Sequence, residues 1–184
     1  MAIREVVLLG DPMLRRKAKK VKKFNQELRQ LADDMLETMR NSYGIGLAGP
    51  QIGILERIFV AEVPDDVDDP NKGKHFVIVN PRIIKRSKEM EEGQEGCLSI
   101  PSHGGMVNRP KEIEMMAMNV YGKKIRMKKV GNLLARIFQH EYDHLNGVLF
   151  IDHIDDLQDV NKFWKIVEED EEENNEQMTM NELQ

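Results

Sequence analysis

Two histidines and a glutamate lie close together in the segment QHEYDHLNG, residues 139–147. If this segment is helical, His140 and His144 share one face about one turn apart, so both imidazole rings can reach the same metal ion. Glu141 follows the first histidine directly, where its carboxylate can take a proton from a water on that metal. The apolar residues just upstream recur at helical spacing, which predicts such a helix. We therefore predict a metal site rather than two histidines packed in a core.

A catalytic metal site of this kind uses a third protein ligand and leaves one position for water. The chain has three other histidines, His75, His103 and His153, and a single cysteine, Cys97. A lone cysteine forms no intrachain disulfide, which indicates a reducing compartment and leaves either a buried, inert thiol or a metal ligand. The segment EGCLSIP, residues 95–101, places Cys97 in a loop at one end of a strand. Because the two-histidine helix needs another ligand, we favour the second interpretation.

A third segment, GIGLAGPQIG at residues 44–53, contains four glycines and a proline. A phosphate-binding loop is not indicated, because no Lys-Ser/Thr pair follows the glycines. Glycines also let a backbone approach a ligand closely, and Gln51 offers a neutral amide donor. Such a donor could stabilise an oxyanion.

The segments GIGLAGPQIG, EGCLSIP and QHEYDHLNG, in that order, resemble the three motifs of peptide deformylases. The resemblance extends over residues 5–155 and implies a metal-dependent hydrolase. Deformylases remove the formyl group from the N-terminal methionine of newly made bacterial and organellar polypeptides. One departure is Gly49, where the family usually has alanine; we expect it to loosen the loop without removing a functional side chain.

The resemblance also implies roles for individual residues. The implied metal ligands are Cys97, His140 and His144, and the implied catalytic groups belong to Glu141, Gln51 and Leu98. Glu141 would pass a proton from the attacking water to the departing amine. The Gln51 amide and the backbone N–H of Leu98 would hold the tetrahedral oxygen together with the metal. Fe(II) is the implied ion in the cell, although zinc, nickel and cobalt also accept thiolate and imidazole ligands. No organic cofactor is expected.

Substrate recognition is implied in the same way. Deformylases bind the peptide as an added strand, so Ile45 and Gly46 should lie along it. Leu133 and Ile137, one turn apart on the predicted metal helix, should line an apolar pocket for the methionine side chain. Arg136 falls there too, and its charge either snorkels outward or narrows the pocket.

Two further residues near the cysteine motif are open to more than one interpretation. Arg109 either pairs with Glu95 and fixes the Cys97 loop, as the resemblance implies, or forms an ordinary surface ion pair. His103 follows Cys97 by six residues. We do not assign it as a ligand, because two helical histidines and Cys97 already complete the site.

The chain has 184 residues, 40% of them hydrophobic, which suits one domain with a substantial core. We place a single catalytic domain at residues 1–167. Residues 168–184 contain eight acidic and no basic residues, and we expect this tail to be disordered. The net charge of −5 is therefore unevenly distributed, because residues 1–167 carry 27 basic and 24 acidic residues. The basic run at residues 15–23 could contact RNA, but we favour a solvated segment.

The remaining pattern indicates an α+β fold. Apolar residues at helical spacing predict an amphipathic helix that ends before Gly44. Strands are predicted at residues 57–63, 75–80, 82–86 and 112–129, the last with a turn at Tyr121-Gly122. We expect antiparallel strands around a central metal-binding helix, with an N-terminal helix packed outside and a C-terminal helix leading to the tail.

The first residues contain only a short apolar run, so we predict neither a signal peptide nor a membrane span. We expect a cytoplasmic protein that acts on formyl-methionyl nascent peptides, with a transient ribosome contact, no membrane partner and no sequence-specific nucleic acid. Two rival functions stay open. A zinc endopeptidase shares the histidine motif but usually takes His or Glu as its third ligand, and a binding protein would keep the fold without catalysis.

Overall fold

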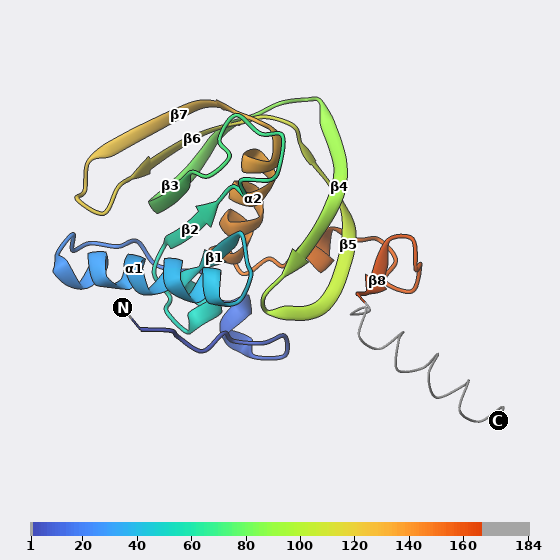
Figure 1. Cartoon of the computed structure of the whole chain (residues 1–184), viewed down its shortest axis with the longest axis horizontal. Coiled ribbons are helices and arrows are strands. Elements are labelled where there is room, and N and C mark those ends of the chain that lie inside the picture. The colour runs from blue at the N-terminus through green and yellow to red at the C-terminus, as the bar shows by residue number, and fades with distance from the viewer. Residues whose placement is uncertain (1, 167–184) are drawn as a thin grey trace.

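The computed structural model describes residues 2–166 (Figure 1). This part of the chain forms two antiparallel sheets, two α-helices and three short 3-10 helices. None of the helices within residues 2–166 combines the length and the apolar character needed to cross a membrane.

The five-stranded sheet has the order β1-β2-β3-β6-β7. Its strands are β1 (Gly46–Ala48), β2 (Ile58–Glu62), β3 (His75–Arg86), β6 (Ile113–Met118) and β7 (Lys124–Val130). The three-stranded sheet has the order β4-β5-β8. Its strands are β4 (Met90–Cys97), β5 (Ile100–Pro110) and β8 (Phe163–Lys165). The helical elements are η1 (Pro12–Arg15), α1 (Gln26–Asn41), η2 (Gly49–Ile52), α2 (Asn132–His144) and η3 (Phe150–His153).

The five-stranded sheet is covered by a helix on each face. In β2, Ile58 and Val60 pack with α1, whereas Phe59 and Ala61 pack with α2, because alternate residues of a strand face opposite sides. All four side chains are buried. Figure 1 shows α2 in the centre of the molecule, with β4 and β5 on its other side. The predicted α+β fold around a central helix is therefore confirmed.

Helix α1 packs on the sheet through residues at three- and four-residue spacing. Leu28, Leu31, Met35 and Met39 are all buried in the cluster that α1 forms with the sheet. Burying each such side chain stabilises the fold by about 1.5–3 kcal/mol. The side chain of Asn25 accepts a hydrogen bond from the Leu28 N–H at 3.2 Å and caps the N-terminus of the helix.

The first described residues are tied to α1 through the buried carboxylate of Asp34. This carboxylate accepts hydrogen bonds from the Gln30 amide (2.9 Å), the Ala2 N–H (2.9 Å) and the Arg4 guanidinium (2.8 and 3.2 Å). The hydrogen bond from Gln30 is the largest cause that lowers the pKa of Asp34, and those from Ala2 and Arg4 lower it further. The Arg4 N–H also donates to Thr38 Oγ1 at 2.9 Å.

The predicted strands agree with the structure in the five-stranded sheet and miss most of the three-stranded one. Residues 75–80 and 82–86 form one strand, β3, with an irregularity at Asn80, whose φ is 51°. Residues 112–129 form β6 and β7 around the predicted turn, where Gly122 has a φ of 78°. The sequence prediction gives no bounds for strands β1, β4, β5 and β8, although it expects a strand next to Cys97. After α2 the described chain forms only η3 and β8, so the predicted C-terminal α-helix is not found before residue 167, and the acidic tail at residues 168–184 lies outside the described residues.

Candidate active site

Three predicted metal ligands meet between α2 and the end of β4. Cys97 is the last residue of β4, and His140 and His144 lie one turn apart on α2. Cys97 Sγ is 3.3 Å from His144 Nε2, and this nitrogen is 3.2 Å from His140 Nε2. Ligand distances of about 2.3 Å for sulfur and 2.0–2.1 Å for nitrogen would hold tetrahedral ligand atoms about 3.3–3.6 Å apart. The donor set and its spacing therefore fit a single divalent ion.

A buried carboxylate orients His140. Glu95 Oε2 accepts a hydrogen bond from His140 Nδ1 at 2.9 Å, which leaves Nε2 of that ring for a metal. Arg109 donates two hydrogen bonds to Glu95, at 2.6 and 2.9 Å, and is itself buried. Burial by itself would raise the pKa of Glu95, but the hydrogen bonds from Arg109 and His140 outweigh it and hold this pKa well below its usual range. The predicted Arg109–Glu95 pair is thus present, and it is not a surface ion pair.

His144 is buried more deeply than His140. Its side chain has an exposed fraction of 1% and lies behind the cavity that the other site residues line. Burial lowers the pKa of His144 well below its usual value, and the neighbouring His140 lowers it further. Its imidazole is therefore neutral near pH 7, which is the form that binds metals.

Glu141 faces the first motif across the site. It is 3% exposed, and a Cβ atom added at Gly46 would lie 2.2 Å from its Oε1. Only glycine leaves room for the carboxylate at this position. Burial raises the pKa of Glu141 to about 7, and its Oε2 has no hydrogen-bond partner among the described residues. The group can therefore exchange a proton with a molecule in the cavity near neutral pH.

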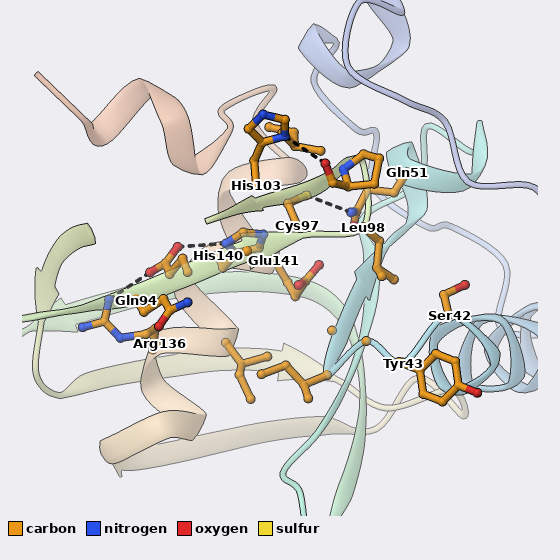
Figure 2. A pocket seen from close by; sticks show the side chains of 18 of the residues that line it. Ser42, Tyr43, Gln51, Gln94, Cys97, Leu98, His103, Arg136, His140 and Glu141 are labelled. Carbon is orange, nitrogen blue, oxygen red and sulfur yellow. Dashed lines mark hydrogen bonds and ion pairs between the residues drawn. The ribbon is translucent and has the colours of Figure 1, made fainter. Parts of the chain in front are cut away.

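Gln51 is held so that its amide nitrogen points at the metal cluster. Its Oε1 accepts a hydrogen bond from the Ala48 N–H at 2.8 Å, which fixes the orientation of the amide. Its Nε2 donates to Cys97 Sγ at 3.4 Å (Figure 2). It also donates to Ser99 Oγ at 3.3 Å. The turn η2 that carries Gln51 is tightly packed, because a Cβ atom at Gly49 would lie 2.7 Å from the Ile54 carbonyl oxygen. Gly49 therefore occupies a position where an alanine Cβ would require the neighbouring backbone to shift, and its effect on the rigidity of the loop stays a prediction.

A cavity of about 510 Å³ connects these groups with the surface. Of the ten predicted site residues, all except His144 line it. The nine that line it are Ile45, Gly46, Gln51, Cys97, Leu98, Leu133, Ile137, His140 and Glu141. Figure 2 shows Cys97, His140 and Glu141 on one side of Leu98, with Ser42 and Tyr43 on the other. His103 also borders the cavity and bonds through Nδ1 to the Pro101 carbonyl (2.9 Å), outside the metal cluster.

A family model described as polypeptide deformylase matches residues 3–160 of this chain. The chain belongs to this family. A peptide deformylase of Thermomicrobium roseum is 45% identical over 157 residues, which cover 85% of this chain and 88% of the relative. A second one, from Pseudothermotoga lettingae, is 46% identical over 152 residues, or 83% of each chain.

Solved structures of deformylases have the same fold. The crystal structure of peptide deformylase from Thermotoga maritima aligns with a TM-score of 0.78 and 38% identity, covering 85% of this chain and all of that one. A Met-Ala-Ser-bound class I type b enzyme from Acinetobacter baumannii aligns with a TM-score of 0.78 and 34% identity, covering 83% of this chain and 99% of that one.

Arg136 lines the cavity, which agrees with the expectation that it narrows the pocket. Its guanidinium does not snorkel outward, since it donates to the carbonyl oxygens of Glu91 (2.8 Å), Gly93 (3.3 Å) and Val107 (2.9 Å). It also donates to Glu95 at 3.0 Å. Arg136 therefore fastens α2 to the β4–β5 hairpin that carries Cys97.

Sequence reasoning missed two supporting residues of this deformylase. Ser99 Oγ accepts a hydrogen bond from the Gln51 amide. Its place directly after Cys97-Leu98 in the second motif is the sequence feature that could have indicated this role. Asp143 accepts hydrogen bonds from Arg109 and His153, both at 2.8 Å. Nothing local in the sequence distinguishes Asp143 from other helix-surface acids, because its partners come from distant segments.

Proposed function

We propose that this chain hydrolyses the formamide bond of formyl-methionyl polypeptides and releases formate and a free N-terminal amine. One observation supports this conclusion most strongly. Cys97, His140 and His144 lie together, and Glu141 borders the same cavity, which opens to the surface. Membership of the deformylase family supports it. A metal-dependent endopeptidase would usually take its third ligand from His or Glu, whereas the third candidate here is a cysteine.

Glu141 is the proton carrier of the proposed reaction. Cys97, His140 and His144 would hold a divalent ion, which would supply Lewis acidity and make a nearby water more acidic. Glu141 accepts a proton as the water oxygen bonds to the formyl carbon. It returns this proton to the nitrogen as the carbon–nitrogen bond breaks, so that the amine leaves neutral. The Glu141 carboxylate suits both transfers by its place, because it borders the cavity and its Oε2 has no hydrogen-bond partner among the described residues.

Two hydrogen-bond donors stabilise the negative charge that develops on the formyl oxygen. We assign them to the Gln51 amide and the backbone N–H of Leu98, which both border the cavity beside Cys97. Because Ala48 fixes the Gln51 amide before substrate binds, little reorganisation is needed in the transition state.

The peptide is proposed to bind as a strand between two sheet edges. Strand β1 is at the edge of the five-stranded sheet and β4 at the edge of the three-stranded sheet, and both contribute residues to the cavity. Ile45 and Gly46 would lie along the peptide from one side. Leu133 and Ile137 line the apolar part and would receive the methionine side chain. The Met-Ala-Ser-bound relative from Acinetobacter baumannii supports this assignment by its fold similarity.

Fe(II) is the ion that we propose for the enzyme in the cell, with zinc, nickel or cobalt as alternatives in purified protein. One thiolate and two imidazoles accept all four ions, so affinity alone does not select among them. Metal analysis of anaerobically purified protein, followed by reconstitution with each ion, tests this choice. Full activity with zinc alone would contradict the iron assignment.

We further propose that residues 1–167 form one catalytic domain of a cytoplasmic enzyme that contacts the ribosome transiently. The family match to residue 160 and the pairing of β8 with β5 support this boundary. The acidic residues 168–184 would then be an appendage without a catalytic role.

The variant Glu141→Gln tests the proposed function most directly. It should keep the metal yet lose about 10²- to 10⁴-fold in rate, because it removes a general base without removing a ligand. Glu112→Gln, at an exposed position outside the cavity, is the matched control and should leave the rate unchanged. Single-turnover deformylation of a formyl-Met peptide and metal content are the measurements. Activity close to wild type in Glu141→Gln, or cleavage of an internal unformylated peptide bond by the wild type, would contradict the assignment.

A further inference from the structure

Residues 7–9 make two backbone hydrogen bonds to segments that carry the proposed oxyanion donors. The Val7 N–H donates to the Gln51 carbonyl oxygen at 2.7 Å. The Leu9 N–H donates to the Ser99 carbonyl oxygen at 2.8 Å. Gln51 bears one donor in its side chain, and Leu98, directly before Ser99, bears the other in its backbone.

These two donor segments belong to different sheets. Gln51 lies in η2, which continues from β1 of the five-stranded sheet, whereas Leu98 and Ser99 connect β4 and β5 of the three-stranded sheet. The Gln51 amide also donates to Ser99 Oγ at 3.3 Å, and Ser99 is completely buried. Val7, Gln51, Ser99 and Leu9 therefore form a closed ring of interactions that spans both sheets.

The segment that closes this ring is itself fixed in place. Ala2 and Arg4 bind the buried Asp34 on α1, and the Arg4 N–H binds Thr38. The side chain of Val7 packs in the apolar cluster that also contains Cys97. Residues 7–9 are thus fixed by the attachment of residues 2–4 to α1 and by the packing of Val7, as a segment that holds two others in position must be.

We propose that residues 7–9 form a backbone clamp that sets the spacing between the Gln51 and Leu98 oxyanion donors, with Val7 and Leu9 as positioning residues for deformylation. This inference rests on the proposed function. Donors that stabilise charge only in the transition state contribute to kcat rather than to substrate binding. Loosening the clamp should therefore lower kcat while KM stays the same.

Leu9→Pro tests the clamp, because proline lacks the N–H that reaches Ser99. The Leu9 side chain is 49% exposed, so its replacement removes little packing. Leu8→Pro is the matched control: Leu8 is 53% exposed, and its N–H donates to no acceptor within residues 2–166. We expect kcat on a formyl-Met peptide to fall about tenfold in Leu9→Pro, with unchanged KM and metal content. Leu8→Pro and Leu9→Ala, which keeps the N–H, should retain wild-type kcat.

Ser99→Ala is a second test that leaves the N-terminal backbone intact. It removes the hydroxyl that accepts a hydrogen bond from the Gln51 amide, and it should also lower kcat at constant KM. Because both changes open the same ring, the double variant with Leu9→Pro should lose less than the product of the two single losses. If Leu9→Pro does not fold, the kcat of Ser99→Ala decides the question.

Three results would overturn the clamp. They are an unchanged kcat in folded Leu9→Pro or in Ser99→Ala, an equal loss in Leu8→Pro, and strictly multiplicative losses in the double variant. A wild type that does not deformylate the peptide at all would instead contradict the proposed function, so the two failures are distinguishable.

Discussion

The sequence resemblance to deformylases implies alanine at the position of Gly49, yet Gly49→Ala should destabilise this chain rather than stabilise it. A Cβ atom at Gly49 would lie 2.7 Å from the Ile54 carbonyl oxygen and 2.8 Å from that of Glu56. Even favourable contacts between carbon and a carbonyl oxygen are about 3.3–3.6 Å long. Both neighbours are backbone atoms, so η2 or the loop at residues 54–56 must move by about half an ångström.

The magnitude follows from the cost of overpacking. An extra methyl group in a well-packed core costs about 1–3 kcal/mol. For a chain of this size each kcal/mol lowers Tm by about 2–4 °C, so a cost of about 2 kcal/mol corresponds to a Tm loss of about 4–8 °C. Gln51 follows Gly49 by two residues and moves with it, which should also lower kcat by about tenfold.

Thermal unfolding and steady-state deformylation, both with the same metal loaded, measure these two effects. Gly131→Ser is the control, because a Cβ atom there would meet only Glu112 Cγ at 3.6 Å and the Lys111 carbonyl oxygen at 3.9 Å. Gly131 is the N-cap of α2, where serine is favoured, so Tm should stay the same or rise. A Tm of Gly49→Ala equal to or above that of the wild type would refute the packing argument.

Three other changes should separate metal binding, charge and the N-terminal attachment. Cys97→Ser should lower both metal occupancy and Tm, because a neutral hydroxyl replaces a thiolate and metal binding is linked to folding; equal values in the two proteins would count against Cys97 as a ligand. Ending the chain after Val167 should leave the kinetics on short peptides unchanged but increase the amount of enzyme that sediments with ribosomes at low salt. This difference from the full chain should disappear as salt is added. If less of the shortened enzyme sediments with ribosomes, residues 168–184 are a docking element. The pKa of Asp34 is lower in the folded than in the unfolded chain. The ionised Asp34 carboxylate therefore contributes fully to stability above a pH of about 4, and this contribution is lost as the pH falls through the pKa of Asp34 in the folded chain. The unfolding free energies of the wild type and Asp34→Asn should therefore differ above that pH and converge below it, and a constant difference would exclude this linkage.

The cluster that could bind a metal was predictable because its sequence signals are local or rare. The four-residue spacing of His140 and His144 indicates that they share one face of a helix, and Cys97 is the single cysteine in the chain. Glu141 follows from its place beside His140. The structure brings ligand atoms of Cys97, His140 and His144 within 4.8 Å of one another, and Glu141 lines the same cavity.

The β4–β5 hairpin that carries Cys97 could not be predicted in this way. Strand β4 reads MEEGQEGC and buries almost none of its side chains, so neither burial alternation nor β-branched residues mark it. Its pairing with β5 is a backbone interaction. Arg136 then reaches carbonyl groups of this hairpin from 29 to 45 residues away. Contacts of such sequence separation leave no periodic signal in either partner.

The end of the described chain borders the substrate cavity, and this has a consequence for protein engineering. Ile166 lines the cavity, and its N–H donates to the Ser102 carbonyl oxygen at 2.8 Å. In a variant that ends after Ile166, a second enzyme joined there by a short linker would lie beside the cavity. Short tethers give effective concentrations of about millimolar. An aminopeptidase or an N-acyltransferase attached there would capture the newly released amine before it diffuses into bulk solution, whereas immobilising the enzyme on a solid support through the same end would obstruct peptide entry.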